Sequence, residues 1–148
     1  MRLALYQPEI AGNVGTIIRT CAAFAVPLDI VEPCGFPFSD RALARAGMDY
    51  VERAQVTRHA DWAAFRAAAP GRIILLTTHA EGTLDRFGFA GDDMLLFGQE
   101  SAGVPETVRA SCDAGVRIAM APGLRSLNVA VSAGIALHEA LRQTGGLS

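Results

Sequence analysis

Three short apolar segments in the second half of the chain place the strongest limit on its fold. They cover residues 72–78 (RIILLTT), 94–98 (MLLFG) and 116–120 (VRIAM), and each is too short for a typical helix. Segments of this length without an alternating polar face are typical of strands buried on both sides of a parallel sheet. Helical patterns separate them along the chain. We therefore predict an α/β fold with a mostly parallel sheet and helices on both faces.

The first half of the chain continues the same alternation, and a length of 148 residues suits one domain, which we place at residues 1–148. Three further strands are predicted at residues 2–6, 28–32 and 50–57, the last with the weakest pattern. Helices are predicted at residues 13–25, from an N-cap at Ser39 through Leu43 and Ala46, from an N-cap at Asp61 to Ala69, and at residues 105–112 and 128–142.

The last predicted helix is apolar around nearly its whole circumference. Its residues 129–137 contain no charged side chain. A helix that is apolar on every side must be covered on every side. That cover is either the rest of the monomer or a second subunit, and we favour a homodimer.

The overall charge argues against a protein that binds nucleic acid by electrostatic attraction alone. The formal net charge is −2, and all 13 basic residues are arginines. The planar guanidinium group of arginine suits phosphate and carboxylate groups. Genome composition is an equally good explanation for the absence of lysine.

Cysteine and histidine usage indicates neither a disulfide framework nor a metal site. The chain has three cysteines without a CxxC pair, and its three histidines are scattered. The N-terminal apolar run ends at Gln7 and Pro8, too early for a signal peptide, and no apolar stretch approaches the roughly 20 residues of a membrane span. We expect a cytoplasmic protein that has no metal ion and does not enter a membrane.

Glycine-rich polar loops follow the three buried strands. They read TTHAEGT from Thr77, GQESAGVP from Gly98 and APGLRSLN from Ala121. Ligands of open parallel sheets bind beyond the carboxyl ends of the strands, so we expect these loops to form one pocket for a flat, adenosine-like ligand. The GxGxxG, GxxxxGK[ST] and GxSxG motifs of the commonest α/β enzymes are missing.

Three motifs resemble those of the SpoU branch of the SPOUT RNA methyltransferases. Residues 13–19 (NVGTIIR) are similar to its first motif, Asn-x-Gly-x-x-x-Arg, and residues 97–105 (FGQESAGVP) to its second. Residues 118–140 resemble the third, which contains Ser-x-Asn. The motifs stand in family order, and other stretches such as residues 32–50 resemble the smallest members, of the TrmL (YibK) type.

This resemblance implies transfer of a methyl group from S-adenosyl-L-methionine to the ribose 2′-hydroxyl of the wobble nucleotide, cytidine or uridine 34, in the tRNA anticodon loop. It also implies a homodimer and a C-terminal trefoil knot, which general topological rules count against. Two alternatives stay open: a 2′-O-methyltransferase for another tRNA or rRNA site, and a non-catalytic nucleotide- or RNA-binding α/β module.

The resemblance also implies roles for individual residues. Arg19 would grip the target phosphate and help the hydroxyl ionise, since its guanidinium is effectively always protonated. Asn13 would order the loop or contact RNA, although it also suits a helix N-cap, and Glu100 would hold the neighbouring loop or contact the substrate. Of Ser126 and Asn128, one would cap the last helix and the other reach the cofactor and ribose. The implied catalytic residues are Arg19, Asn13, Glu100, Ser126 and Asn128, and the implied cofactor contacts are Leu76, Gly98, Ile118 and Ser126.

Arginines are the candidate RNA contacts on this slightly acidic chain. Arg125 stands beside Ser126, and four more are spread among acidic residues, so a plain solvated face is an equal alternative for them: Arg41, Arg45, Arg53 and Arg58.

Overall fold

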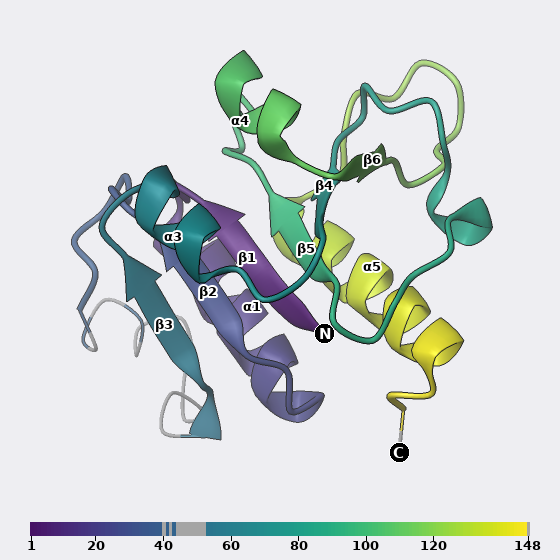
Figure 1. Ribbon diagram of the computed structural model, residues 1–148. Coiled ribbons are helices and arrows are strands. Elements are labelled where there is room, and N and C mark those ends of the chain that lie inside the picture. The colour runs from purple at the N-terminus through teal and green to yellow at the C-terminus, as the bar shows by residue number, and fades with distance from the viewer. Residues whose placement is uncertain (40, 42, 44–52, 148) are drawn as a thin grey trace.

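A parallel sheet forms the centre of the molecule in the computed structural model, which describes residues 1–39, 41, 43 and 53–147 (Figure 1). Within these residues the sheet has six strands in the order β3-β2-β1-β5-β4-β6, and every neighbouring pair is parallel. The predicted α/β class is therefore confirmed. The strands are β1 (Arg2–Tyr6), β2 (Leu28–Val31), β3 (Val56–His59), β4 (Ile73–Leu76), β5 (Met94–Phe97) and β6 (Ala114–Val116).

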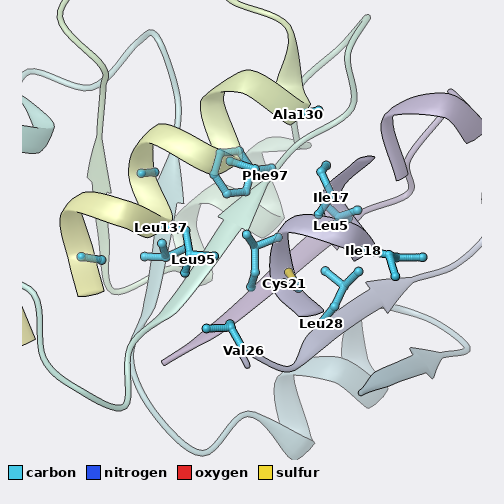
Figure 2. Close-up of a cluster of buried hydrophobic side chains, with 14 of the residues drawn as sticks. Leu5, Ile17, Ile18, Cys21, Val26, Leu28, Leu95, Phe97, Ala130 and Leu137 are labelled. Carbon is cyan, nitrogen blue, oxygen red and sulfur yellow. The ribbon is translucent and has the colours of Figure 1, made fainter. Parts of the chain in front are cut away.

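Helices cover both faces of this sheet, as predicted. Helices α1 (Ala11–Ala23) and α5 (Val129–Thr144) contact each other on one face, and their buried residues form one cluster with β1 and β5 (Figure 2). On the other face, α3 (Trp62–Ala68) and α4 (Glu106–Ser111) share a second cluster with the same strands. A short 3₁₀ helix, η2 (Leu84–Arg86), follows β4. No helix among the described residues combines the length and the apolar character that crossing a membrane would require.

The larger cluster fixes the position of α5 against α1 and the sheet. Leu137 of α5 is fully buried and lies with Leu95 of β5 and Cys21 of α1 in one cluster (Figure 2). Full burial of one such leucine contributes about 1.5–3 kcal/mol to folding. The small side chains of Ala133 and Ala136 are also fully buried, which lets α5 lie close to its neighbours. The N-terminus of α5 is therefore held at a defined place.

A buried carboxylate is neutralised on the other face of the sheet. Asp29 of β2 is only 3% exposed, and it accepts hydrogen bonds from Nε of Arg2 at 2.8 Å and contacts Nε2 of His59 at 2.8 Å. The ring of Phe65 packs edge-on against His59. Because a buried charge is tolerated only when it is paired, this group ties β1, β2 and β3 together beneath α3.

Several predicted boundaries differ from those observed, and the strand at residues 116–120 is largely wrong. Strand β6 ends at Val116, after pairing with β4, and Arg117 makes only an isolated bridge to Thr83. The apolar residues Ile118 and Met120, which suggested a strand, instead line a cavity. These apolar side chains form part of the cavity wall and do not belong to a strand of the sheet.

Boundaries in the first half shift as well. Helix α1 begins at Ala11 after an N-cap at Ile10, so Asn13 is not its N-cap. Asp61 does cap α3, since its Oδ1 accepts a hydrogen bond from the backbone N–H of Ala64 at 2.8 Å. Strand β3 begins only at Val56, and residues 50–52 of that predicted strand lie outside the described residues, as does Ala46 of the predicted helix after Ser39. The knot stays a prediction.

Candidate active site

A cavity of about 610 Å³ lies where the predicted loops meet. Its walls come from the ends of β4 and β5, from the segment after β6, and from the start of α5. These loops meet because β4 lies between β5 and β6, so the three carboxyl ends are neighbours at one edge of the sheet. Figure 1 shows this edge, with α4 beyond the arrowhead of β5.

The cavity brings together most of the residues singled out in the sequence. All four expected cofactor contacts line it, namely Leu76, Gly98, Ile118 and Ser126. Asn13, Glu100 and Asn128 line it too, whereas Arg19 is not among its lining residues. Loops that are distant in the chain thus form one concave site.

The loop after β5 folds back over its own start. The backbone N–H of Gln99 donates to the carbonyl of Gly103 at 2.8 Å, and the N–H of Gly103 donates to the carbonyl of Gln99 at 2.9 Å. A Cβ on Gly98 would lie 2.6 Å from the carbonyl carbon of Gly103, and Gly103 itself has a φ of +64°. Glycine is needed at both positions, one for the close approach and one for the left-handed backbone.

Three side chains form a hydrogen-bonded chain at the rim of the cavity. Nδ2 of Asn13 donates to Oε1 of Glu100 at 3.4 Å, and Nδ2 of Asn128 donates to Oδ1 of Asn13 at 3.0 Å. The second oxygen of Glu100 accepts from the backbone N–H of Glu9 at 3.2 Å. These hydrogen bonds join the loop after β1, the loop after β5 and the N-terminus of α5.

Asn128 is also the N-cap of α5. Its Oδ1 accepts from the backbone N–H of Ala130 at 2.8 Å and from that of Val131 at 3.3 Å. Of the two polar residues before α5, Asn128 therefore caps the helix, and Ser126 stands exposed on the cavity wall. Asn128 is thus the capping residue of the two, and a contact of Ser126 with the cofactor and ribose stays a prediction.

Glu9 and Ser101 make a second link between the loops that sequence reasoning missed. The carboxylate of Glu9 accepts hydrogen bonds from the backbone N–H of Ser101 at 2.9 Å and from its hydroxyl at 2.7 Å. These two bonds, the backbone bond first, lower the pKa of Glu9 below its ordinary value. The signal in the sequence was an acidic residue between a strand end and a helix start, next to the motif that begins at Asn13.

Arg19 lies further along α1 and faces solvent. It stands six positions after Asn13, which corresponds to about 9 Å along a helix axis. Arg125 is exposed in the loop before α5. Arg58 forms an ion pair with Glu32 and places its guanidinium 4.3 Å above the ring centre of Phe38. Arg41 and Arg53 are described and exposed, whereas Arg45 lies outside the described residues.

Metal ligands are not grouped in the described part of the chain. No set of three or more His, Cys, Asp or Glu residues there is arranged to hold a metal ion. The polar groups that line the cavity include amides, hydroxyls, backbone atoms and charged side chains.

A family profile matches most of the chain. Residues 1–138 match the SpoU rRNA Methylase family. The chain belongs to this family. The matched residues include the ends of β4 and β5, the segment after β6 and the start of α5, which line the cavity.

Curated and solved SpoU-like proteins extend the comparison. A protein of Beijerinckia indica named tRNA (cytidine(34)-2′-O)-methyltransferase is 52% identical over 149 residues, covering 99% of this chain and 93% of the relative. A solved structure on the 2-OH methylation of C/U34 on tRNA is 42% identical, with a TM-score of 0.93 and coverage of 99% of this chain and 97% of that one. An AdoMet-bound rRNA methyltransferase from Sinorhizobium meliloti is 30% identical, with a TM-score of 0.85, and covers 99% of this chain and 57% of its own.

Proposed function

We propose that this chain transfers a methyl group from S-adenosyl-L-methionine to the 2′-hydroxyl of the wobble ribose, cytidine or uridine 34, of tRNA. The observation that carries the proposal is the cavity formed by the three strand-end loops, with Asn13, Glu100 and Asn128 hydrogen-bonded at its rim. The names of the full-length relatives support both the reaction and the position.

The cavity suits the methyl donor in size and chemistry. Its volume of about 610 Å³ falls in the usual range for small-molecule sites. Apolar side chains of Leu76, Ile118 and Met120 offer a surface for a flat adenine ring, while the strand ends offer backbone N–H and C=O groups. Gly98 lets the folded loop approach its own start closely, because the backbone of Gly103 occupies the space that a side chain would take. An AdoMet-bound family relative supports this assignment.

S-Adenosyl-L-methionine supplies the methyl group, which is bound to a positively charged sulfur. The ribose oxygen forms a bond to the methyl carbon while the carbon–sulfur bond breaks and its electrons pass to sulfur. The hydroxyl proton is released. The protein's contribution is mainly position. The paired amides of Asn13 and Asn128 and the carboxylate of Glu100 hold the start of α1, the loop after β5 and the N-terminus of α5 in one arrangement. Holding two reactants in a productive geometry lowers a barrier by up to about 7–11 kcal/mol.

Arg19 acts on the RNA side of the reaction in this proposal. A permanently charged guanidinium binds the phosphate next to the target ribose and stabilises the oxygen as it loses its proton. The displacement of Arg19 from the cavity along α1 supports a contact with the substrate rather than with the cofactor. Exposed arginines, among them Arg125, Arg41 and Arg53, provide further phosphate contacts.

The assembly and location follow from the same proposal. Val131 and Ile135 on α5 are 51% and 41% exposed in the single chain, and an apolar face of this kind suits a second copy. We propose a homodimer that works in the cytoplasm, where its tRNA substrate is found, without a metal ion.

The direct test incubates the purified protein with labelled S-adenosyl-L-methionine and total tRNA, followed by nuclease mapping of the labelled ribose. Label at nucleotide 34 is the expected result. The Arg19→Ala variant tests the role of Arg19. Its methyl transfer should fall by at least about a thousandfold, while its cofactor affinity stays within a few-fold of the wild type.

Other results would redirect the proposal. Label at another tRNA position or only in rRNA would assign a different 2′-O-methylation site. Cofactor binding without label in any RNA would favour a non-catalytic module. Strong loss of cofactor affinity in Arg19→Ala would contradict the role given to Arg19.

A further inference from the structure

The cavity wall contains one arginine among its described residues, Arg109 of α4. The same wall contains one carboxylate, Glu100. Both oxygens of Glu100 already accept hydrogen bonds, one from Glu9 and one from Asn13. A charged ligand group that enters the cavity therefore meets one permanently positive side chain, Arg109. The negative side chain, Glu100, already accepts hydrogen bonds at the rim.

Arg109 has part of its hydrogen-bonding capacity unused, and its side chain as a whole is 40% exposed. Its Nε is inaccessible to solvent and has no hydrogen-bond partner among the described residues. The nearest acidic oxygen, on Glu106, is 3.9 Å away, too far for a hydrogen bond, and the Glu106 side chain is 85% exposed. A charged donor nitrogen that is shielded from solvent without a partner is costly to keep, even on a partly exposed side chain, and a ligand acceptor removes that cost.

The methyl donor carries an acceptor of the required kind. Its adenosine part is uncharged and suits the strand ends, whereas its amino-acid part ends in a carboxylate. Arginine binds carboxylates through two parallel N–H···O bonds, a geometry that a lysine ammonium does not reproduce. We propose, on the basis of the methyl-transfer function above, that Arg109 binds the α-carboxylate of S-adenosyl-L-methionine and so selects donors that carry an amino-acid tail.

The experiment separates this contact from general damage to the cavity by comparing two ligands. S-Adenosylhomocysteine has the amino-acid carboxylate, and 5′-deoxy-5′-methylthioadenosine has the same adenosine without it. Isothermal titration calorimetry of the purified protein with each ligand requires no RNA. The variants are Arg109→Gln and Arg109→Lys, with Arg66→Gln as the matched control, because Arg66 is an exposed helical arginine of α3 that does not line the cavity.

Arg109→Gln is expected to weaken S-adenosylhomocysteine binding by at least about tenfold and to change methylthioadenosine binding by less than about twofold. Arg109→Lys should retain part of the difference between the two ligands, and Arg66→Gln should bind both as the wild type does. Thermal melting of each variant checks that it is folded.

Equal weakening of both ligands in a folded Arg109→Gln variant would overturn the proposal, because it would indicate a structural role. Unchanged binding of both ligands together with a raised KM for tRNA would also overturn it and assign Arg109 to an RNA phosphate. A wild-type protein that binds neither ligand would reject the methyl-transfer function itself, and this contact with it.

Discussion

Asn128 uses both ends of one amide at the rim of the cavity. Its oxygen accepts the first free N–H groups of α5, and its nitrogen donates to Asn13 on α1. A serine or threonine hydroxyl would have to accept and donate through one oxygen atom, whereas the amide places its acceptor and its donor on two separate atoms. The amide therefore connects the stability of a helix end to the geometry of the proposed active site.

Changing Asn128 to Asp should separate these two functions. A carboxylate still accepts from Ala130 and Val131 and is favoured at a helix N-terminus, so the melting temperature should stay close to that of the wild type. The donor to Asn13 is lost, and kcat/KM for tRNA should fall by at least about tenfold. Asn128→Ala loses the cap as well and should unfold with about 1 kcal/mol less free energy in urea titrations. Wild-type activity in the Asp variant would show that the link to Asn13 is not needed.

At the scale of the elements, the turn after β5 shapes the cavity. Strand β5 is buried along its whole length, and the chain then reverses between Gln99 and Gly103 directly over Gly98. The backbone of Gly103 occupies the space that a side chain on Gly98 would take. Because β5 is paired on both sides, with β1 and with β4, a larger residue at Gly98 is expected to displace the turn that carries Glu100 rather than the strand.

Gly98→Ala is therefore expected to open the turn. The added methyl would lie within 2.6–2.8 Å of three backbone atoms of Gly103, and relieving such a contact typically costs about 1–3 kcal/mol. Cofactor affinity measured by calorimetry should drop by at least about tenfold. Gly82→Ala is the matched control, because a Cβ there has no neighbour within 4 Å. If the two variants bound the cofactor equally well, the turn would not define the site.

At the scale of the whole molecule, α5 has two sides with different surroundings. Ala133, Ala136 and Leu137 are fully buried against α1 and the sheet. Val131 and Ile135 are exposed on the single chain. The sequence-based expectation that this apolar helix is covered on every side is thus met by the monomer on one side only, which leaves the other for the proposed second copy.

A charge on the exposed side should dissociate the proposed dimer. Wild-type protein should sediment with twice the mass of one chain, and Ile135→Glu should sediment as a monomer with an unchanged far-ultraviolet circular dichroism spectrum, since a carboxylate is expensive to bury in an apolar contact. Leu147→Glu, an exposed apolar position beyond the end of α5, should remain dimeric. Monomeric wild-type protein would contradict the proposed assembly.

Local patterns were sufficient to predict much of the fold. Strand β1 matches its predicted bounds, and Asp61 caps α3 as its residue type and position suggested. Prediction failed where apolar residues had another purpose, as at Ile118 and Met120, which line the cavity instead of continuing β6. It also misplaced the start of α1, because the first helical turn follows an Ile10 that makes no side-chain cap.

The sequence by itself determined the class of the fold, the family and the set of polar residues near the strand ends, because periodicity and motif spacing are local properties of the chain. Only the tertiary structure decided which of those residues meet. Asn13 is 87 residues from Glu100 and 115 from Asn128, and they touch because β5 lies beside β1 while α5 packs on α1. Nε of Arg109, which has no partner within the described part of the chain, and the exposed side of α5 also depend on what packs around them, and no local pattern of residues predicts that packing.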